Sequence, residues 1–465
     1  MSRARVLLIS PPAPKSNTTV IPDLGLGYLA TALRKADYTV KICQAERDFQ
    51  RRMIHERTRD FSPNLFGIKI FSLESHSAGE TIAELAREYP HVPIIAGGPH
   101  VSIVPPADLF QQFPALTYGI RGEAEISLPL LTNAMMGGTG PDLSMIPGLV
   151  YRTDNGVRSN PLVLHKNLDD FGFPAWDLID PRNYDDRWFF WARDYPGAPI
   201  LATRGCPYHC TFCAQNVVTG KEVRRRSPEH IIEELNHLYE SYGIRNFDFI
   251  DDHLLLGPKF IHKIVWGIIN NGKKISWSAG GARLDFLDRE LIQLLDRSGC
   301  EIIGVGIESG TKRVLDYMRK GLSTDLVKEK MFLINRLSNI KVIGLFILGF
   351  PTETAAEVRK TIDFACQLPL HMANFNTYIS MPGCEEFDRL IARGEIDAPN
   401  WEELGLDAHT YVPKGMTRRQ LQSLYRQAIL RFYARPSRLL NILWYSRNRI
   451  PHLFHKAIRK TFWKS

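Results

Sequence analysis

The sequence predicts an α/β protein with two successive parallel sheets and a helical C-terminal region. Three observations support this. Apolar runs alternate with amphipathic segments over residues 1–146, the alternation starts again at Pro199, and a basic amphipathic stretch follows it. The 465 residues are 44% hydrophobic and 23% charged, which is the composition of a globular protein.

The first series predicts an open, doubly wound, Rossmann-like sheet over residues 1–146. Its expected strands are 5–9, 38–42, 65–70, 92–96 and 115–118, and its expected helices are 24–35, 78–89 and 123–136. In such sheets ligands bind outside the carboxyl ends of the strands. No G-x-G-x-x-G motif follows the first strand, so a dinucleotide is not expected.

Residues 147–198 predict a hairpin that turns at residues 154–156, followed by a connector rich in proline and aromatic residues. The second series, over residues 199–400, predicts a partial (β/α)6 barrel whose functional loops follow the strands. Its expected strands are 200–203, 247–251, 275–279, 302–307, 342–348 and 373–379, and its expected helices are 228–242, 288–298, 324–337 and 353–368. Residues 401–465 form the remaining, helical region.

Three cysteines lie within eight residues, directly after the first strand of the second series. They are Cys206, Cys210 and Cys213. Iron–sulfur clusters normally take four cysteines, so three would leave one iron open to bind and activate a ligand. The alternative is a structural zinc site with His209 or a distant cysteine as the fourth ligand. Structural zinc sites usually combine two ligand pairs of the C-x-x-C or H-x-x-H type. The chain contains no second pair of this type, which favours the open cluster.

The remaining composition points to a reducing compartment. The seven cysteines show no disulfide framework, the apolar run at the start is too short for a signal peptide, and no apolar stretch reaches ~18 residues. We therefore expect a cytoplasmic protein.

The cysteine spacing, with Phe212 before the last cysteine, resembles the signature of radical S-adenosylmethionine (SAM) enzymes. Three later segments also resemble motifs of that family, at residues 249–252, 306–309 and 346–351. Segments 97–100 and 118–123 resemble the cobalamin-binding domain of the subclass that combines both cofactors, which includes anaerobic cyclases and methyltransferases. The resemblance implies a [4Fe–4S] cluster on the three cysteines, SAM bound to its open iron, cobalamin in the first domain, and a flavodoxin- or ferredoxin-like electron donor.

The resemblance also implies residue roles at the ends of the barrel strands. Asp251 and Asp252 would hold the SAM ammonium, and Arg283 its carboxylate. The other SAM residues that we expect are Glu308 and Ser309 at the ribose, Gly349 and Phe350 at the adenine, and Phe212 beside the last cysteine. For each polar residue, the alternative is a solvated or salt-bridged loop position.

In the first domain, the resemblance implies cobalamin contacts from the loops after the strands. These residues are Ser72, Leu73, Gly97, Gly98, Pro99, His100, Gly122 and Glu123. Residues 1–150 lack the D-x-H-x-x-G motif whose histidine ligates cobalt. Either cobalt has no lower ligand from the protein, or the domain does not bind cobalamin. We expect His100 to make a backbone or tail contact rather than to ligate cobalt.

Cys384 follows the sixth barrel strand, on the side where substrate is expected. A thiol there could quench a radical or bind substrate, although a packed core residue is favoured.

The C-terminal region carries the basic charge of the chain. Residues 414–465 hold 13 Lys or Arg and no Asp or Glu, so the rest of the chain has a net charge of −5. Basic amphipathic helices favour peripheral contact with an anionic membrane, here the inner membrane surface. The alternative is that the first helix packs on the barrel and only the remainder is a solvated arm. Nucleic acid binding is not favoured.

Together these features predict a cobalamin-dependent radical SAM enzyme that methylates an unactivated carbon of a lipid or tetrapyrrole-like substrate. The second hypothesis is an oxidative cyclase or ring-rearranging enzyme with the same cofactors. The third is a non-catalytic cobalamin or iron sensor that binds nucleic acid.

Overall fold

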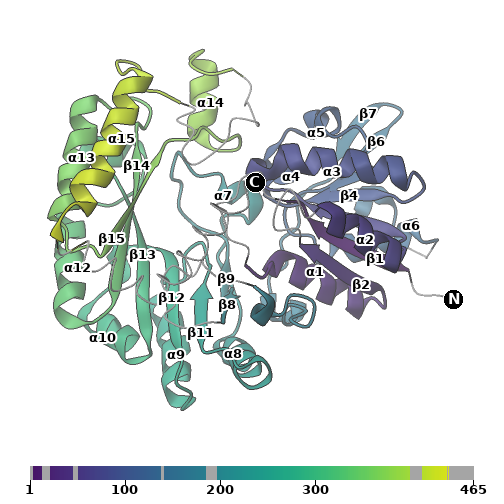
Figure 1. Ribbon diagram of the computed structural model, residues 1–465, viewed down its shortest axis with the longest axis horizontal. Helices are drawn as coiled ribbons and strands as arrows, with labels where there is room; N and C mark the ends of the chain where they lie inside the picture. Colours follow the sequence, from purple (N-terminus) through teal and green to yellow (C-terminus); the bar gives the residue numbers. More distant parts are fainter. Residues whose placement is uncertain are drawn as a thin grey trace, which may run out of the picture.

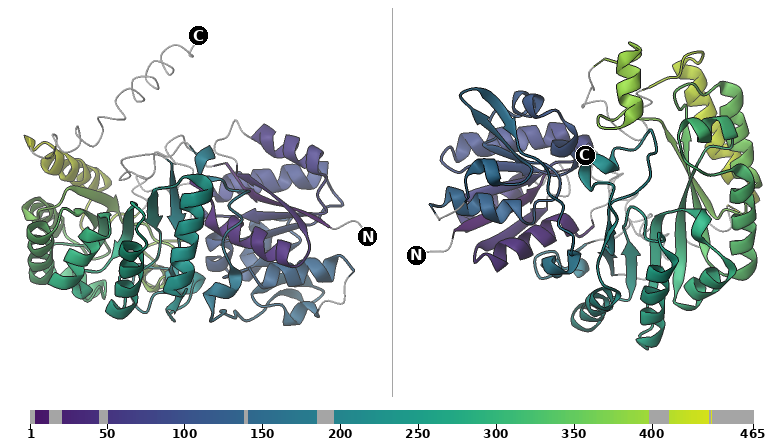
Figure 2. Two further views of the ribbon diagram at one scale, coloured as in Figure 1. Left: turned by 90° about the horizontal axis from the view of Figure 1, so that it is seen from below. Right: turned by 180° about the vertical axis from the view of Figure 1, so that it is seen from behind.

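The computed structural model describes residues 4–12, 21–44, 51–137, 141–184, 196–397, 411–436 and 438. Figure 1 shows two lobes side by side, an N-terminal one and a larger one that contains the second half of the chain. The two further views in Figure 2 show the same division into two lobes.

In the described residues the first lobe is built on a seven-stranded sheet with the order β2-β1-β3-β4-β5-β6-β7. Its strands are β1 (Arg5–Ser10), β2 (Thr39–Gln44), β3 (Leu65–Lys69), β4 (Ile94–Gly97), β5 (Tyr118–Ile120), β6 (Leu149–Thr153) and β7 (Gly156–Ser159). Strands β1 to β5 are parallel, as the Rossmann-like prediction requires. The β6–β7 hairpin adds antiparallel to β5, so it extends this sheet.

Helices cover both faces of this sheet because alternate strand residues point to opposite sides. Val6 and Leu8 pack with residues of α1 and α6, whereas Leu7 and Ile9 pack in a second cluster with residues of α2, α3, α4 and α5. These helices are α1 (Leu24–Lys35), α2 (Arg51–Phe61), α3 (Ser75–Glu88), α4 (Pro99–Ile103), α5 (Pro106–Gln112) and α6 (Ser127–Met135). Short 3-10 turns also occur, at η2 (Ser72–Glu74), η3 (Leu143–Met145), η4 (Leu168–Phe171), η5 (Pro181–Asn183) and η6 (Leu284–Phe286).

The second sheet has six parallel strands within the described ranges, in the order β15-β14-β13-β12-β11-β8. They are β8 (Gly197–Ile200), β11 (Asn246–Phe249), β12 (Ser276–Ala282), β13 (Cys300–Glu308), β14 (Lys341–Leu348) and β15 (Met372–Thr377). Consecutive strands are neighbours and the sheet is open, which confirms the partial barrel. A separate antiparallel ribbon pairs β9 (Thr203–Arg204) with β10 (Arg224–Arg225).

Capping residues mark the ends of several helices in the second lobe. The Ser227 side chain accepts from the backbone of His230 at the start of α8, and Gly243 ends that helix in the left-handed region. Thr354 and Glu357 form a capping box at the start of α13. The helices are α7 (Gln215–Val218), α8 (Pro228–Tyr242), α9 (Pro258–Asn270), α10 (Arg289–Arg297), α11 (Lys312–Tyr317), α12 (Thr324–Leu337), α13 (Ala355–Gln367), α14 (Glu385–Ala392) and α15 (Arg418–Tyr433).

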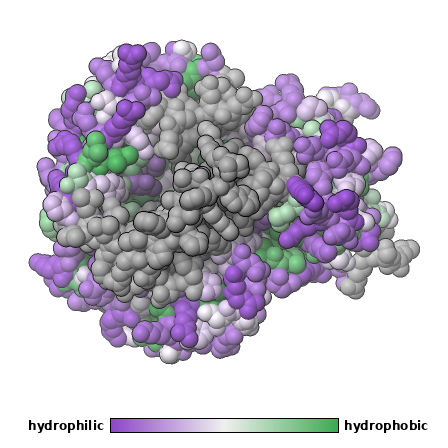
Figure 3. All heavy atoms as spheres, viewed as in Figure 1, coloured by the Kyte–Doolittle hydropathy of each residue, from purple (hydrophilic) through white to green (hydrophobic). Residues whose placement is uncertain are grey.

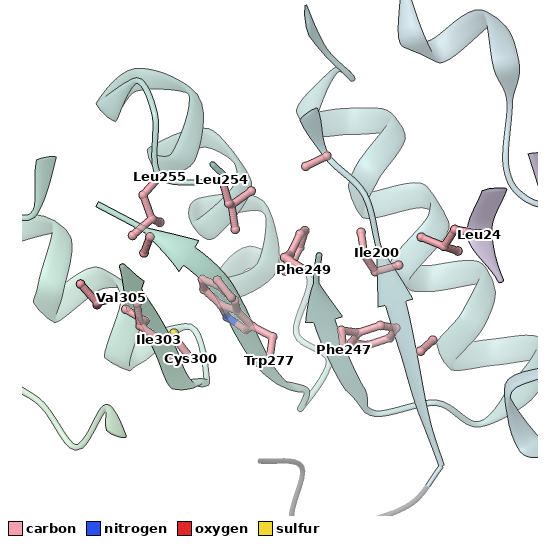
Figure 4. Packing of buried hydrophobic residues seen from close by; sticks show 14 of the residues in the cluster. Leu24, Ile200, Phe247, Phe249, Leu254, Leu255, Trp277, Cys300, Ile303 and Val305 are labelled. Carbon is pink, nitrogen blue, oxygen red and sulfur yellow. The ribbon is translucent and has the colours of Figure 1, made fainter. Parts of the chain in front are cut away.

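One hydrophobic cluster runs through both lobes. Figure 4 shows Leu24 of α1 beside Ile200 of β8, with Phe247, Phe249 and Trp277 continuing the cluster into the second sheet. Strand β8, at the edge of its sheet, therefore joins the lobes through buried apolar contact rather than through a polar linker alone.

Helix α15 packs on the second lobe through its apolar side. Leu421, Leu424, Ala428 and Phe432 are buried, and the Phe432 ring contacts Phe375 of β15. This part of residues 414–465 is thus unavailable for the predicted membrane contact, because the apolar side that would enter a membrane is covered by protein. Residues 439–465 lie outside the described residues.

No helix among the described residues is long and apolar enough to cross a membrane. On the face drawn in Figure 3, the described surface is mostly hydrophilic, with scattered hydrophobic patches.

The packing of α15 leads to a stability prediction. Phe432→Ala should lower the free energy of unfolding by about 3–5 kcal/mol, because it leaves a cavity against β15. Leu430→Ala on the same helix is the control. Its side chain is 66% exposed, so the change should stay within about 0.5 kcal/mol. Urea unfolding followed by circular dichroism measures both values. Equal losses in the two variants would contradict this packing.

Candidate active site

The three-cysteine loop lies between the two strands of the β9–β10 ribbon, at the carboxyl end of β8. Gly205 begins the loop with φ 91°, and a Cβ there would clash with the carbonyl oxygen of Glu222. The loop thus needs glycine to turn away from the ribbon. The backbone N–H of Thr211 donates to the Met318 carbonyl at 3.0 Å, which holds the loop against the segment after α11.

All three loop cysteines are free thiols. Burial raises the pKa of Cys210, and the nearby cations Lys320 and Arg283 partly oppose that rise. Among the described residues, no three His, Cys, Asp or Glu side chains converge as ligands of a single ion. A single zinc ion draws its ligands to one point, whereas a cluster takes each thiolate on a different iron. Three soft sulfur donors on one short loop are the ligand type that an iron–sulfur cluster takes.

The Asp251 carboxylate is hydrogen-bonded inside the fold. It is 4% exposed, and its carboxylate accepts from the backbone N–H of Ala202 at 3.0 Å and from the backbone N–H and hydroxyl of Thr203. These hydrogen bonds tie the end of β11 to the chain between β8 and β9. Because the Asp251 carboxylate already accepts these hydrogen bonds inside the fold, its contact with the SAM ammonium stays a prediction.

Asp252 faces the other way and lines a cavity between the lobes. Its Oδ2 accepts from the Gln215 side chain at 3.0 Å and from the Thr219 hydroxyl at 3.1 Å. Burial raises its pKa despite these donors. One carboxylate of the predicted pair is therefore placed where a ligand can reach it.

Glu308 and Arg283 are both engaged with neighbouring residues. Glu308 has φ 67° and accepts from Lys320 Nζ at 2.7 Å, in an ion pair that is about nine-tenths buried. Arg283 donates to Asp285 and to the Lys320 and Gly321 carbonyls, and its guanidinium lies 3.9 Å from the centre of the Tyr208 ring. This matches the salt-bridged alternative for both residues. Lys320 was not predicted from the sequence.

The other expected SAM residues divide into two groups. Ser309 is fully buried and its hydroxyl is hydrogen-bonded to those of Thr311 and Thr361, so its contact with the ribose stays a prediction. Gly349 and Phe350 donate their backbone N–H groups to Glu353 at 2.8 and 3.1 Å. The Phe350 ring meets the rings of Phe212, Tyr317 and Tyr378 edge-on, in an apolar cluster beside the cysteine loop.

Cys384 is 1% exposed and its thiol donates to the Met381 carbonyl at 2.9 Å. It stands at the start of α14 as a packed residue, in line with the favoured interpretation.

A cavity of about 500 Å³ separates the carboxyl edge of the first sheet from the base of the cysteine loop. Its lining is mainly apolar. Of the predicted cobalamin residues, Gly97, Gly98, Pro99, Gly122 and Glu123 line it. Gly98 has φ 99°, and a Cβ there would meet the Ile70 carbonyl oxygen at 2.9 Å. Glycines at the strand ends and a largely apolar lining let a ring-shaped ligand approach the backbone closely at this site.

The remaining three predicted cobalamin residues do not line the cavity. Leu73 lies at the surface, while Ser72 bonds His100. His100 is fully buried, with Nδ1 3.2 Å from the Ser72 hydroxyl and Nε2 2.9 Å from Gln112 Oε1. Both ring nitrogens of His100 therefore have partners within the domain.

The cavity also contains charged residues that the sequence analysis missed. Asp23 caps α1 and pairs with Lys69, and Glu74 lies beside them with a pKa raised to about 7 by burial. Their sequence pattern is weak evidence for a binding site, because Asp23 has the pattern of an ordinary helix cap and Lys69 that of a strand end.

Four buried charges join the lobes at the base of the cysteine loop, and we call Glu123, Glu125, Arg204 and Arg224 the interdomain clasp. Glu123 bonds both terminal nitrogens of Arg224, at 2.5 and 2.6 Å, and Glu125 bonds Arg204 at 2.6 Å. All four side chains are at most 9% exposed. Arg204 and Arg224 sit on β9 and β10, so they bracket the cysteine loop. The Glu123 carboxylate accepts from Arg224 and also lines the cavity, and its predicted contact with cobalamin stays a prediction.

This architecture, a glycine-lined cofactor domain facing a three-thiolate loop on an open parallel barrel, defines a two-domain enzyme that positions two cofactor sites against each other. Residues 16–132 match the B12 binding domain and residues 200–365 match the radical SAM superfamily. The chain is 31% identical to the uncharacterized methyltransferase PH0819 of Pyrococcus horikoshii, over 95% of both chains. It therefore belongs to the B12-binding radical SAM enzymes.

More distant relatives have several activities. The chain is 25% identical to the cytidylyl-2-hydroxyethylphosphonate methyltransferase of Streptomyces wedmorensis, over 80% of this chain and 78% of that protein. It is 23% identical to the anaerobic magnesium-protoporphyrin IX monomethyl ester cyclase of Cereibacter sphaeroides, over 89% of this chain and 67% of that protein.

Among solved structures, the fold resembles the radical SAM methyltransferase TsrM of Kitasatospora setae. The TM-score is 0.70 at 20% identity, covering 92% of this chain and 85% of that one. That TsrM structure contains cobalamin and a [4Fe–4S] cluster.

The clasp generates a prediction about stability. Glu123→Gln should lower the free energy of unfolding by about 3–5 kcal/mol, because it leaves Arg224 charged, buried and unpaired. Asp177→Asn is the control, since it breaks the half-exposed Arg34–Asp177 pair and should cost at most about 1 kcal/mol. Chemical unfolding measures both. Similar small losses would mean that solvent reaches the clasp.

Glu353 generates a prediction about pH. It is fully buried and its pKa is raised to about 8, mainly by burial. The unfolded chain has a lower glutamate pKa, near 4.3, so the folded state binds more protons between those values. The Glu353 contribution to the free energy of unfolding therefore falls as pH rises from about 4.3 to 8. The wild type should lose stability relative to Glu353→Gln over this window. A constant difference across that window would contradict the raised pKa.

Proposed function

We propose that this protein is a cobalamin-dependent methyltransferase that adds a methyl group to an unactivated carbon of a small hydrophobic molecule. The observation that carries the proposal is the cavity between the B12-binding domain and the base of the cysteine loop, bordered by residues of both lobes. The 31% identity over nearly the whole chain to a protein named as an uncharacterized methyltransferase supports the reaction class.

Each lobe would bind a different cofactor. Cys206, Cys210 and Cys213 would hold the cluster, and the cavity beside Gly97 and Gly122 would hold cobalamin. When bound, these groups supply the electron that cleaves SAM and a carrier for the methyl group.

The polar side chains around these sites orient what binds there. The Lys320–Glu308 pair and Arg283 place fixed charges beside the cysteine loop, and Asp252 offers a carboxylate toward the cavity. The apolar cluster around Phe350 excludes water on the far side of the loop.

A hydrophobic substrate is supported by exposed apolar side chains at the edge of this cavity and by a relative named for a magnesium protoporphyrin. Phe71 and Ile250 line the cavity and are each 40% exposed, so apolar surface reaches solvent at the boundary between the lobes.

The cluster assignment is tested with cysteine variants. Anaerobically reconstituted wild type should contain about four irons per chain, and Cys210→Ala should lose the cluster absorbance and all 5′-deoxyadenosine formation. Cys366→Ala, in the core of α13, is the control and should retain both. A reconstituted wild type that forms no 5′-deoxyadenosine would instead support the sensor hypothesis.

Cyclisation is the second hypothesis, because one relative is named as a cyclase. Product analysis separates it from methylation. Extracts of strains with and without the protein are compared for a metabolite that gains 14 mass units, roughly one methylene. The proposal requires that S-adenosylhomocysteine accompany it, because a cyclase consumes no methyl donor. A cyclised product without S-adenosylhomocysteine would refute the methyltransferase assignment.

A further inference from the structure

His253 is a buried histidine whose polar atoms have no use inside the fold. It follows Asp252 in the loop after β11 and is 2% exposed. Neither ring nitrogen has a hydrogen-bond partner on another of the described residues. His100, also buried, has a partner for each nitrogen. Since buried polar groups are nearly always hydrogen-bonded, such an orphaned ring requires an explanation.

The surroundings of the ring are aromatic. It stacks on Tyr208 with the ring centres 5.7 Å apart, and it meets the edge of Phe286 at 5.9 Å. A phenylalanine would make the same contacts without burying two polar atoms. Packing therefore does not explain why this position carries an imidazole.

Burial, assisted by nearby cations, keeps the ring neutral. Burial is the main cause that lowers the pKa of His253 to about 4, and Arg283 and Lys320 act in the same direction while Asp285 opposes them. A neutral imidazole has one N–H donor and one nitrogen acceptor. It can thus serve a ligand that carries both an acceptor and a donor, such as the carboxylate and ammonium of an amino acid.

We propose that His253 is a positioning residue that hydrogen-bonds the amino-acid end of bound SAM. Tyr208, on which the ring stacks, stands between Cys206 and Cys210, so His253 lies against the segment that would hold the cluster. The amino-acid end is the part of SAM that would attach to that cluster. The inference rests on the proposed function, because it needs a bound cluster and SAM.

Equilibrium dialysis of SAM against the anaerobically reconstituted full chain, with the cluster oxidised, tests this contact. His253→Phe should weaken binding by roughly tenfold or more, and His253→Asn, which keeps one donor and one acceptor, by less. Iron content should not change. Without cofactors, His253→Phe should unfold at or above the wild-type temperature, because an unpaired polar group has been removed.

His371→Phe is the matched control. His371 accepts from the Val342 backbone at 3.2 Å near the amino end of β14, at the opposite end of the strand from the cysteine loop. It should bind SAM like the wild type.

The outcomes are distinct. If His253→Phe binds SAM as tightly as the wild type, the inference is overturned and a buried water is the remaining partner. Loss of iron from both His253 variants would overturn it in favour of a packing role. A wild type that holds iron but binds no SAM would overturn the proposed function itself.

Discussion

The interdomain clasp is the contact on which the rest of the site depends. Two arginines on the strands that flank the cysteine loop meet two glutamates on the loop after β5. All four are removed from water, so each charge is tolerated only while its partner is present. Any movement of one lobe away from the other would expose or separate these charges at a large energetic cost.

This constraint fixes the relation between the two proposed cofactor sites. The glutamates belong to the edge of the first sheet where the cavity opens, and the arginines to the base of the loop with the thiols. Apolar packing between Leu24 of α1 and Ile200 at the end of β8 supports the same junction. A methyl group can pass between two sites only if their separation is maintained, and here buried charge and apolar contact maintain it together.

Around the cysteine loop, cations and carboxylates occur in pairs that neutralise each other. Lys320 with Glu308, and Arg283 with Asp285, leave little net charge near the thiols. Such a setting is compatible with a ligand that is itself a zwitterion. It also explains why several side chains that appeared free in the sequence proved to be engaged: polar groups at buried strand ends need partners whether or not a ligand is present.

The sequence by itself determined the two-sheet architecture, the parallel strands, and the loop that carries Cys206, Cys210 and Cys213, because hydrophobic periodicity and short motifs are local properties. Only the tertiary structure decided the roles of Asp251, Ser309 and Glu123, which depend on partners 49, 52 and 101 positions away. It likewise revealed Lys320 and the unpartnered ring of His253, since burial and long-range pairing are not encoded in any one segment of the chain.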